Sequence, residues 1–203
     1  LRRSRGILAH ITSLPTDFGI GDPGQSAFDF ADFLSAAGQS HWQILPIVPI
    51  GAGNSPYKSP STFAGNTLLI CPRKLCDIGL ISHDELHAAI RPQSNQVNYG
   101  DVSTVKKRLL HQAFSAFDAD AGPEERAEFE IFCEREKYWL HDYALYEVLS
   151  ARNDGRSWMD WGADEAFRNP AAMHRTREDD RQAYRQVQFG QYLFGMQWKA
   201  LRS

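Results

Sequence analysis

The sequence has few cysteines, no long apolar run and no strong excess of charge of either sign. Its three cysteines, Cys71, Cys76 and Cys133, do not have the spacing of a zinc site. An odd and low number of cysteines argues against a disulfide framework, so we expect buried thiols in a reduced, cytoplasmic setting. No apolar stretch approaches the roughly 20 residues of a membrane span, so we expect no membrane partner.

The charge balance also removes several classes of partner. Lys and Arg number 22 against 25 Asp and Glu, which gives a net charge of −3. This balance offers no general attraction for nucleic acid or anionic lipid. The 203 residues, with 42% hydrophobic and 23% charged, are typical of a globular chain of one to two domains. The first residue is Leu rather than Met, which suggests a processed or excised segment.

The start of the chain predicts a strand, a helix and a second strand. Residues 6–11 form a short apolar run that is typical of a buried strand. Residues 22–25 (DPGQ) then predict a helix capped by Asp22, with Pro at the first helical position, and Gly38 suits the left-handed residue after its end. Residues 41–46 predict a second strand. Together they indicate a βαβ unit with parallel strands.

The rest of the chain is mainly helical in its pattern. We expect a short strand at residues 68–70 and a short helix that begins with a capping box at Ser82. Asp101 is predicted to cap a further helix, residues 123–149 to form one long helix, and residues 176–203 to form the last. Because parallel sheets usually contain several strands covered on both faces, two strands indicate the front part of a larger α/β protein.

The loop from residue 51 to residue 65 carries the most chemical information. Glycines at its start allow unusual backbone angles and the close approach of a ligand. Asn54 and Ser55 offer short polar side chains, and Tyr57 combines a flat apolar face with a hydroxyl, as a sugar pocket needs. The loop follows a predicted parallel strand, and ligands of α/β sheets bind beyond the carboxyl ends of the strands. A well-packed loop without a ligand is the alternative.

Several stretches of the sequence combine into a specific pattern. They are 10–24 (HITSLPTDFGIGDPG), 42–46 (WQILP), 53–57 (GNSPY), 63–66 (FAGN), 136–140 (EKYWL), 142–145 (DYAL) and 197–198 (QW). This pattern resembles the 4-α-glucanotransferases, also called amylomaltases or disproportionating enzymes. The resemblance covers nearly the whole chain and is weakest over residues 153–180.

The resemblance implies an α/β fold, a (β/α)8 TIM barrel with helical insertions, of which this chain supplies the first two strands and their connecting helix. Residues 1–66 would begin the barrel, residues 67–175 would form a mainly helical insertion subdomain, and residues 176–203 would form a helix that returns to the barrel. The implied reaction transfers α-1,4-glucan segments between maltooligosaccharides by a retaining double displacement. No metal and no organic cofactor is implied.

The resemblance also implies which residues act. The catalytic Asp, Glu and Asp of the family would lie beyond residue 203, so we expect no catalytic residue here and an inactive chain. Asn54, Ser55 and Tyr57 match donor-side sugar contacts, although Asn54 stands where several relatives have Asp. His10 ends the first predicted strand at the active-site end of the barrel; a hydrogen-bonded structural histidine is its alternative.

Two other interpretations stay open. The chain could be a stand-alone glucan-binding module, or a structural fragment that self-associates through the exposed edge of an incomplete barrel. The remaining aromatic residues of interest are expected in the core rather than in a binding platform. They are Trp139, Tyr143, Trp158, Trp161 and Trp198.

Overall fold

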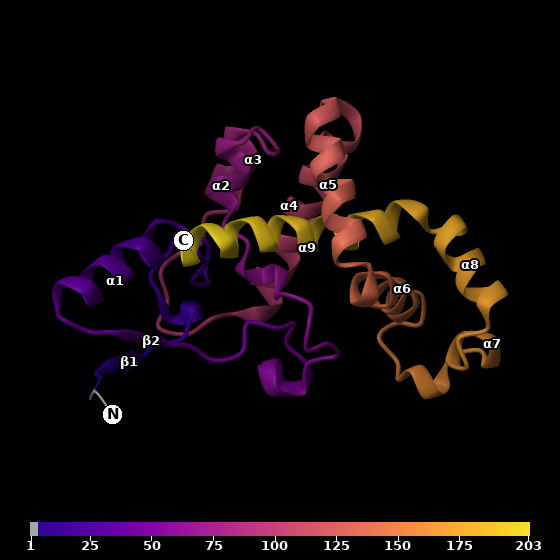
Figure 1. The fold of residues 1–203 in the computed structure, drawn as a ribbon, viewed down its shortest axis with the longest axis horizontal. Helices are drawn as coiled ribbons and strands as arrows, with labels where there is room; N and C mark the ends of the chain where they lie inside the picture. The colour runs from indigo at the N-terminus through magenta and orange to yellow at the C-terminus, as the bar shows by residue number, and fades with distance from the viewer. Residues whose placement is uncertain (1–3) are drawn as a thin grey trace. The chain divides into compact units, whose positions relative to one another are not determined.

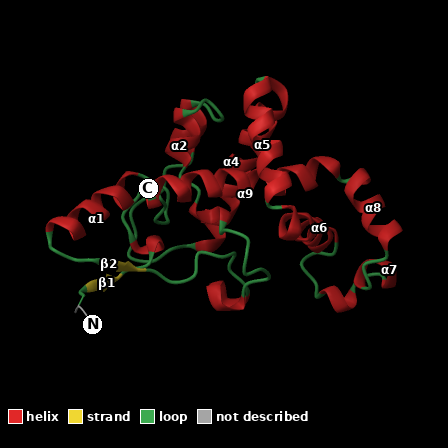
Figure 2. Ribbon diagram, viewed as in Figure 1, coloured by secondary structure: helices red, strands yellow, loops and turns green. Residues whose placement is uncertain are grey.

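The computed structural model describes residues 4–203, and Figures 1 and 2 show the order of its elements. The strands are β1 (Gly6–Leu8) and β2 (His41–Gln43). The α-helices are α1 (Gln25–Ala36), α2 (Pro72–Asp77), α3 (His83–Ala88), α4 (Tyr99–Asp120), α5 (Pro123–Arg135), α6 (Lys137–Arg152), α7 (Ala163–Ala166), α8 (Pro170–Asp179) and α9 (Arg181–Arg202). Short 3-10 helices are η1 (Ile11–Ser13), η2 (Ala52–Asn54), η3 (Pro56–Lys58), η4 (Thr67–Leu69) and η5 (Trp158–Asp160).

The described chain divides into two compact units. The first contains the residues up to Ala121 together with Leu193–Ser203, and the second contains Gly122–Tyr192. Helix α9 therefore contributes its first half to the second unit and its last residues to the first. The resemblance implies different boundaries, at residues 66 and 175, which separate the barrel from the helical insertion. These boundaries stay a prediction.

The first unit contains the predicted strand–helix–strand order. β1 and β2 pair in parallel, with Gly6 opposite His41 and Leu8 opposite Gln43, and α1 connects them. The ring of Phe30 on α1 meets the ring of Trp42 edge-on, with centroids 5.0 Å apart. The parallel pairing predicted from the sequence is thus confirmed.

The strands are shorter and more exposed than predicted. Each has three residues, and the apolar side chains of Ile7 and Leu8 in β1 are exposed. The predicted burial of this strand is therefore wrong for the part of the chain that the structure describes. The physical reason is that the sheet has only two strands here, so that no neighbouring strand covers β1 on its outer side.

Local capping signals explain where some helices begin and end. Ser82 forms the predicted capping box: its Oγ accepts the Glu85 N–H at 3.2 Å, while the Glu85 carboxylate accepts the Ser82 N–H at 2.7 Å. Gly38 adopts the predicted left-handed conformation, with φ of 67°. Asp22 does not cap α1, which begins at Gln25 after Gly24. Its buried carboxylate instead accepts the Gly24 N–H at 2.9 Å.

Four further predictions of secondary structure are wrong. Residues 68–70 are not a strand, because the Asn66 side chain accepts the Leu68 N–H and starts η4. Helix α4 is capped by Asn98 rather than Asp101. The long helix predicted over 123–149 is divided into α5 and α6 at Glu136. The last helix is likewise divided, into α8 and α9 at Asp180.

Each unit has its own apolar core. The first unit buries Ile11, Phe18, Leu34, Leu69, Leu75, Val102, Leu109 and Phe194. The second buries Phe129, Leu140, Ala144, Leu145 and Phe189, with the rings of Phe129 and Phe189 edge-on at 5.6 Å. Trp161 is in the core as predicted, whereas Trp158 is half-exposed, which corrects the prediction for that residue. None of the helices described is long and apolar enough to cross a membrane.

Candidate functional site

The 51–65 loop is an ordered turn built from two 3-10 helices, η2 and η3. The Gly51 N–H donates to the Ser55 carbonyl at 3.0 Å and closes η2. A Cβ on Gly51 would lie 1.8 Å from the Lys58 carbonyl oxygen, so only glycine fits where the loop crosses itself. Gly53 has φ of 70°, the left-handed region that glycine adopts readily. The glycines thus fix the shape of the loop, as the sequence suggested.

Three of the four predicted site residues lie on this turn. The Ser55 Oγ accepts the Tyr57 N–H at 3.3 Å and caps η3, so this hydroxyl also has a structural task. Asn54 is exposed in a left-handed conformation, with φ of 58°. The Tyr57 side chain is 73% exposed. The turn therefore presents an amide and an aromatic face to solvent, a pair suited to the hydroxyls and the C–H face of a sugar ring.

Sequence reasoning missed one exposed aromatic side chain on the same loop. Phe63 is 61% exposed, and its backbone is held by Ser61, whose Oγ accepts the N–H groups of Phe63 and Ala64 at 3.2 and 3.1 Å. The signal for such a turn was present in the polar run before Phe63. Nothing in the sequence alone distinguished an exposed from a buried Phe at this position.

His10 lies at the carboxyl end of β1 but outside the strand, where it precedes η1. Its ring is half-buried, its Nδ1 is buried without a hydrogen-bond partner, and this burial lowers the pKa of the imidazole. Its Nδ1 thus does not make the hydrogen bond expected of a structural histidine, and the sugar-binding role of His10 stays a prediction. Within residues 4–203 no hydrogen bond joins His10 to Asn54, Ser55 or Tyr57.

The parallel pairing nevertheless directs the chain after β1, which contains His10, and the chain after β2, which leads to the loop, to the same edge of the sheet. The Ala9 N–H donates to the Gln43 carbonyl at 3.0 Å, and the Trp42 indole N–H donates to the Ala9 carbonyl at 2.7 Å. The chain that follows β1 and the chain that follows β2 therefore leave from one edge, the carboxyl edge. This is where ligands of parallel α/β sheets bind.

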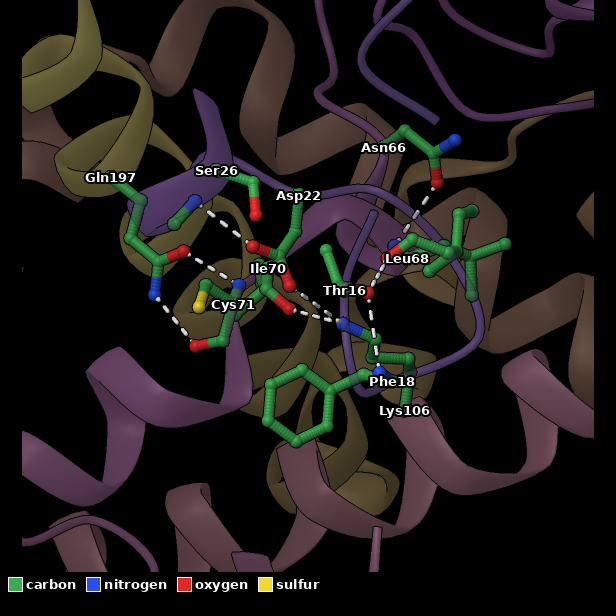
Figure 3. Close-up of polar contacts among 12 residues, drawn as sticks. Thr16, Phe18, Asp22, Ser26, Asn66, Leu68, Ile70, Cys71, Lys106 and Gln197 are labelled. Atoms are coloured by element: carbon green, nitrogen blue, oxygen red, sulfur yellow. Dashed lines mark hydrogen bonds and ion pairs between the residues drawn. The ribbon is translucent and has the colours of Figure 1, made fainter. Parts of the chain in front are cut away.

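A buried polar cluster lies where the loop returns to the core of the first unit (Figure 3). We call it the loop anchor, and it consists of Asn66, Ile70, Cys71, Lys106 and Gln197. The Lys106 ammonium donates to the Ile70 carbonyl at 2.5 Å and faces the Asp22 carboxylate at 3.9 Å. Burial lowers the pKa of Lys106, while the facing Asp22 works in the opposite direction. The anchor thus holds a charged group, the Lys106 ammonium, inside the protein.

Two further observations concern metal binding and thiol reactivity in the described residues. In the described part of the chain no group of three or more His, Cys, Asp or Glu side chains could hold a metal ion. Cys71 and Cys133 are buried, and burial raises the pKa of each thiol to about 11. A thiol in this state is a poor nucleophile at neutral pH.

Comparison with known proteins gives consistent matches over this chain. A family profile described as 4-alpha-glucanotransferase matches residues 9–203. The chain is 40% identical to the 4-alpha-glucanotransferase of Thermus thermophilus and 38% identical to that of Synechocystis, in each case over all of this chain and 40% of the relative. It also resembles the structure of an amylomaltase from Streptococcus agalactiae in complex with acarbose, with a TM-score of 0.91 and 32% identity over 98% of this chain and 40% of that one. The chain thus spans about 40% of the length of these relatives.

Proposed function

The chain belongs to the 4-alpha-glucanotransferase family, and we propose that it is the N-terminal part of an enzyme that transfers α-1,4-glucan segments between maltooligosaccharides. The reaction would be a retaining double displacement, in which an Asp attacks the anomeric carbon and a Glu protonates the leaving oxygen. An acceptor sugar would then release the covalent intermediate. The observation that carries the proposal is the family match over residues 9–203, joined to an exposed aromatic loop at the carboxyl edge of the sheet.

Within that enzyme, this chain would bind sugar rather than break its bonds. We assign Tyr57 as an aromatic platform, with Asn54 and Ser55 as hydrogen-bonding groups and His10 as a polar group at the same edge of the sheet. The exposure of Tyr57 and Asn54 supports this assignment. The catalytic carboxylates would come from sequence beyond residue 203, so the isolated chain would be inactive. The two parallel strands would be the first two of a (β/α)8 barrel in a cytoplasmic protein.

The central test is the substitution Tyr57→Ala in the full-length protein that contains this chain. Loss of a sugar platform should lower kcat/KM for maltotriose by roughly 5- to 150-fold, because stacking on one aromatic face is worth about 1–3 kcal/mol in related recognition of flat ligands. The melting temperature should change little, because the side chain is exposed and makes few contacts. Steady-state kinetics with product separation, together with thermal unfolding, measure both quantities.

Tyr138→Ala is the matched control, since Tyr138 is 68% exposed on α6 of the second unit. It should leave transfer unchanged. If Tyr57→Ala keeps wild-type kinetics but melts earlier, Tyr57 is structural and the assignment is wrong. If the 203-residue chain alone converts maltotriose into glucose and longer oligosaccharides, the catalytic carboxylates lie within it, and that part of the proposal is wrong.

The exposed face of β1 supports a second candidate, self-association of this chain. Ile7 and Leu8 present apolar side chains from a strand in a two-stranded sheet. Such an edge can pair with a second copy. Sedimentation velocity over a tenfold range of concentration tests it: a concentration-independent monomer would contradict self-association.

A further inference from the structure

The side chain of Gln197 on α9 binds both backbone groups of Cys71. Its Oε1 accepts the Cys71 N–H at 2.7 Å, and its Nε2 donates to the Cys71 carbonyl at 3.3 Å (Figure 3). Gln197 is 6% exposed, so these bonds are shielded from water. One amide thus pairs with a main chain as a neighbouring strand would, and it fixes the position of Cys71 against the end of α9.

Lys106 holds the residue before Cys71. Its Nζ donates to the Ile70 carbonyl at 2.5 Å, from a side chain on α4 that is almost completely buried. Three successive backbone groups, the Ile70 carbonyl and both groups of Cys71, are therefore held by side chains rather than by a sheet or helix. Breaking any of these bonds would leave a buried polar group without a partner, which is costly.

This anchored segment is where the 51–65 loop returns. The Asn66 N–H donates to the Ile47 carbonyl at 2.8 Å, so the chain before the loop and the chain after it are joined at the base. Phe194 lies three residues before Gln197 on α9, hence on the same face of the helix. A Cβ on Gly65 would lie 2.0 Å from the Phe194 ring, so backbone and ring are in close contact. The last turns of α9 therefore contact the loop's return at two points.

We propose that Gln197 and Phe194 are positioning residues for sugar binding: they hold the base of the 51–65 loop so that Tyr57 stands where a glucan can stack on it. Neither side chain needs to touch the sugar. The inference rests on the proposed function, because it gives the loop its sugar-binding task. Its physical basis is that a binding group must be held within about 0.5 Å of its productive position by the residues packed behind it.

The decisive comparison is between two buried glutamines on the same helix. Gln188 is 5% exposed and also makes two hydrogen bonds, to the Tyr184 hydroxyl at 3.2 Å and from Arg185 at 3.1 Å, but these lie within the second unit. In the full-length protein, Gln197→Met and Gln188→Met should lower the melting temperature similarly. Only Gln197→Met should raise the KM for maltotriose, by about tenfold with kcat within about twofold, since the lost positioning acts on binding. Equal KM values for the two variants would overturn the proposal.

A second readout does not depend on transfer activity. Lys58 lies exposed on the 51–65 loop, and Arg156 lies exposed in the second unit. In the full-length protein, Gln197→Met should speed tryptic cleavage after Lys58 several-fold while cleavage after Arg156 stays unchanged, as followed by peptide mass spectrometry. Phe194→Leu, which keeps an apolar side chain beside Gly65, should act in the same direction and serves if Gln197→Met does not fold. Unchanged cleavage at Lys58 in both variants would overturn the inference.

The two proposals can fail separately. A wild-type full-length protein without transfer activity would contradict the proposed function, and the proteolysis result would still decide whether α9 orders the loop. An active wild-type protein whose Gln197 variant keeps both its KM and its cleavage pattern would contradict the positioning role alone.

Discussion

The 51–65 loop and the loop anchor that follows it use polar side chains in opposite ways. In the loop, Asn54 and Tyr57 are exposed to solvent, and the hydrogen bonds that shape the turn join residues close together in the sequence. In the anchor, Lys106 and Gln197 are buried, and they bind the backbone of residues far away in sequence. The loop is free to meet a ligand because the anchor has already satisfied the main chain behind it.

This difference separates stability from binding within one stretch of chain. Burying a charge or an amide is costly unless it is paired, so the anchor's groups are committed to the fold. The exposed polar groups of the loop are not required by the fold in this way. Ligand sites need a few such polar groups beside an apolar surface. Changes in the anchor should therefore lower stability and also, through the loop that it holds, sugar affinity, whereas changes in the loop should mainly lower affinity.

The largest effect should follow from removing the buried charge of the anchor. Lys106→Met would leave the Asp22 carboxylate buried without its cation, which costs about 3–5 kcal/mol in the free energy of unfolding. Urea unfolding measures this quantity. The neighbouring Lys107→Met, at an exposed position of α4, is the control and should change stability by less than about 0.5 kcal/mol.

A double variant sharpens this prediction. Asp22→Asn combined with Lys106→Met removes both charges, so the double variant should be more stable than Lys106→Met alone. A double variant that loses the sum of the two single effects would show that the pair does not interact, contrary to the view of the anchor given above.

A smaller and different effect is expected from Gly51→Ala. The new methyl group would meet the Lys58 carbonyl, so the turn must open. Because η2 and η3, which this glycine shapes, contain no buried residue, the free energy of unfolding should fall by less than about 1 kcal/mol. The affinity of the full-length protein for maltotriose, measured by calorimetry, should nevertheless fall about tenfold.

Gly162→Ala is the control for this substitution. Gly162 has φ of −55°, and a Cβ there meets nothing within 4 Å. It should leave both stability and affinity near wild type. A Gly51→Ala protein with full affinity would show that the shape of the loop does not matter for sugar binding.

The smallest effect concerns pH. Burial lowers the pKa of His10 and of His141, so below the usual pKa of about 6.5 the unfolded state binds more protons than the folded state. The contribution of each ring to the free energy of unfolding should therefore be fully present above about pH 6.5 and be lost as the pH falls through its lowered pKa. Urea unfolding at pH 7.5 and 5.5 of wild type, His10→Asn and His141→Asn measures it. A steeper loss in either variant would contradict the assignment.

Local signals in the sequence were sufficient for part of the fold. The capping box at Ser82 and the left-handed Gly38 depend on residues within one turn, so a short window contains all of their physics. The turn that carries Asn54, Ser55 and Tyr57 was likewise predicted from its glycines and proline, and Asn54 and Tyr57 are exposed on it. The sugar-binding role of the three residues stays a prediction.

Long-range contacts account for most of what the sequence did not reveal. Asp22 has every local feature of a cap, yet its carboxylate turns inward because Lys106 on α4 faces it. The helix predicted over 123–149 is divided at Glu136, where the sequence contains neither Gly nor Pro as a signal. At this point the Glu136 carboxylate accepts the Trp139 indole N–H at 2.9 Å. The exposure of Trp158 and Phe63 likewise depends on which surfaces meet, and hydropathy does not encode this.

The pairing of Cys71 with Gln197 also sets an order in time. The two residues are 126 positions apart, so the bond cannot form during synthesis until these further residues have been made. At synthesis rates of about 5–20 residues per second, roughly 6–25 s pass between the appearance of the two partners. Throughout that interval the backbone groups of Cys71 lack the Gln197 amide as a partner. The base of the loop therefore takes its final form well after its own residues have been translated.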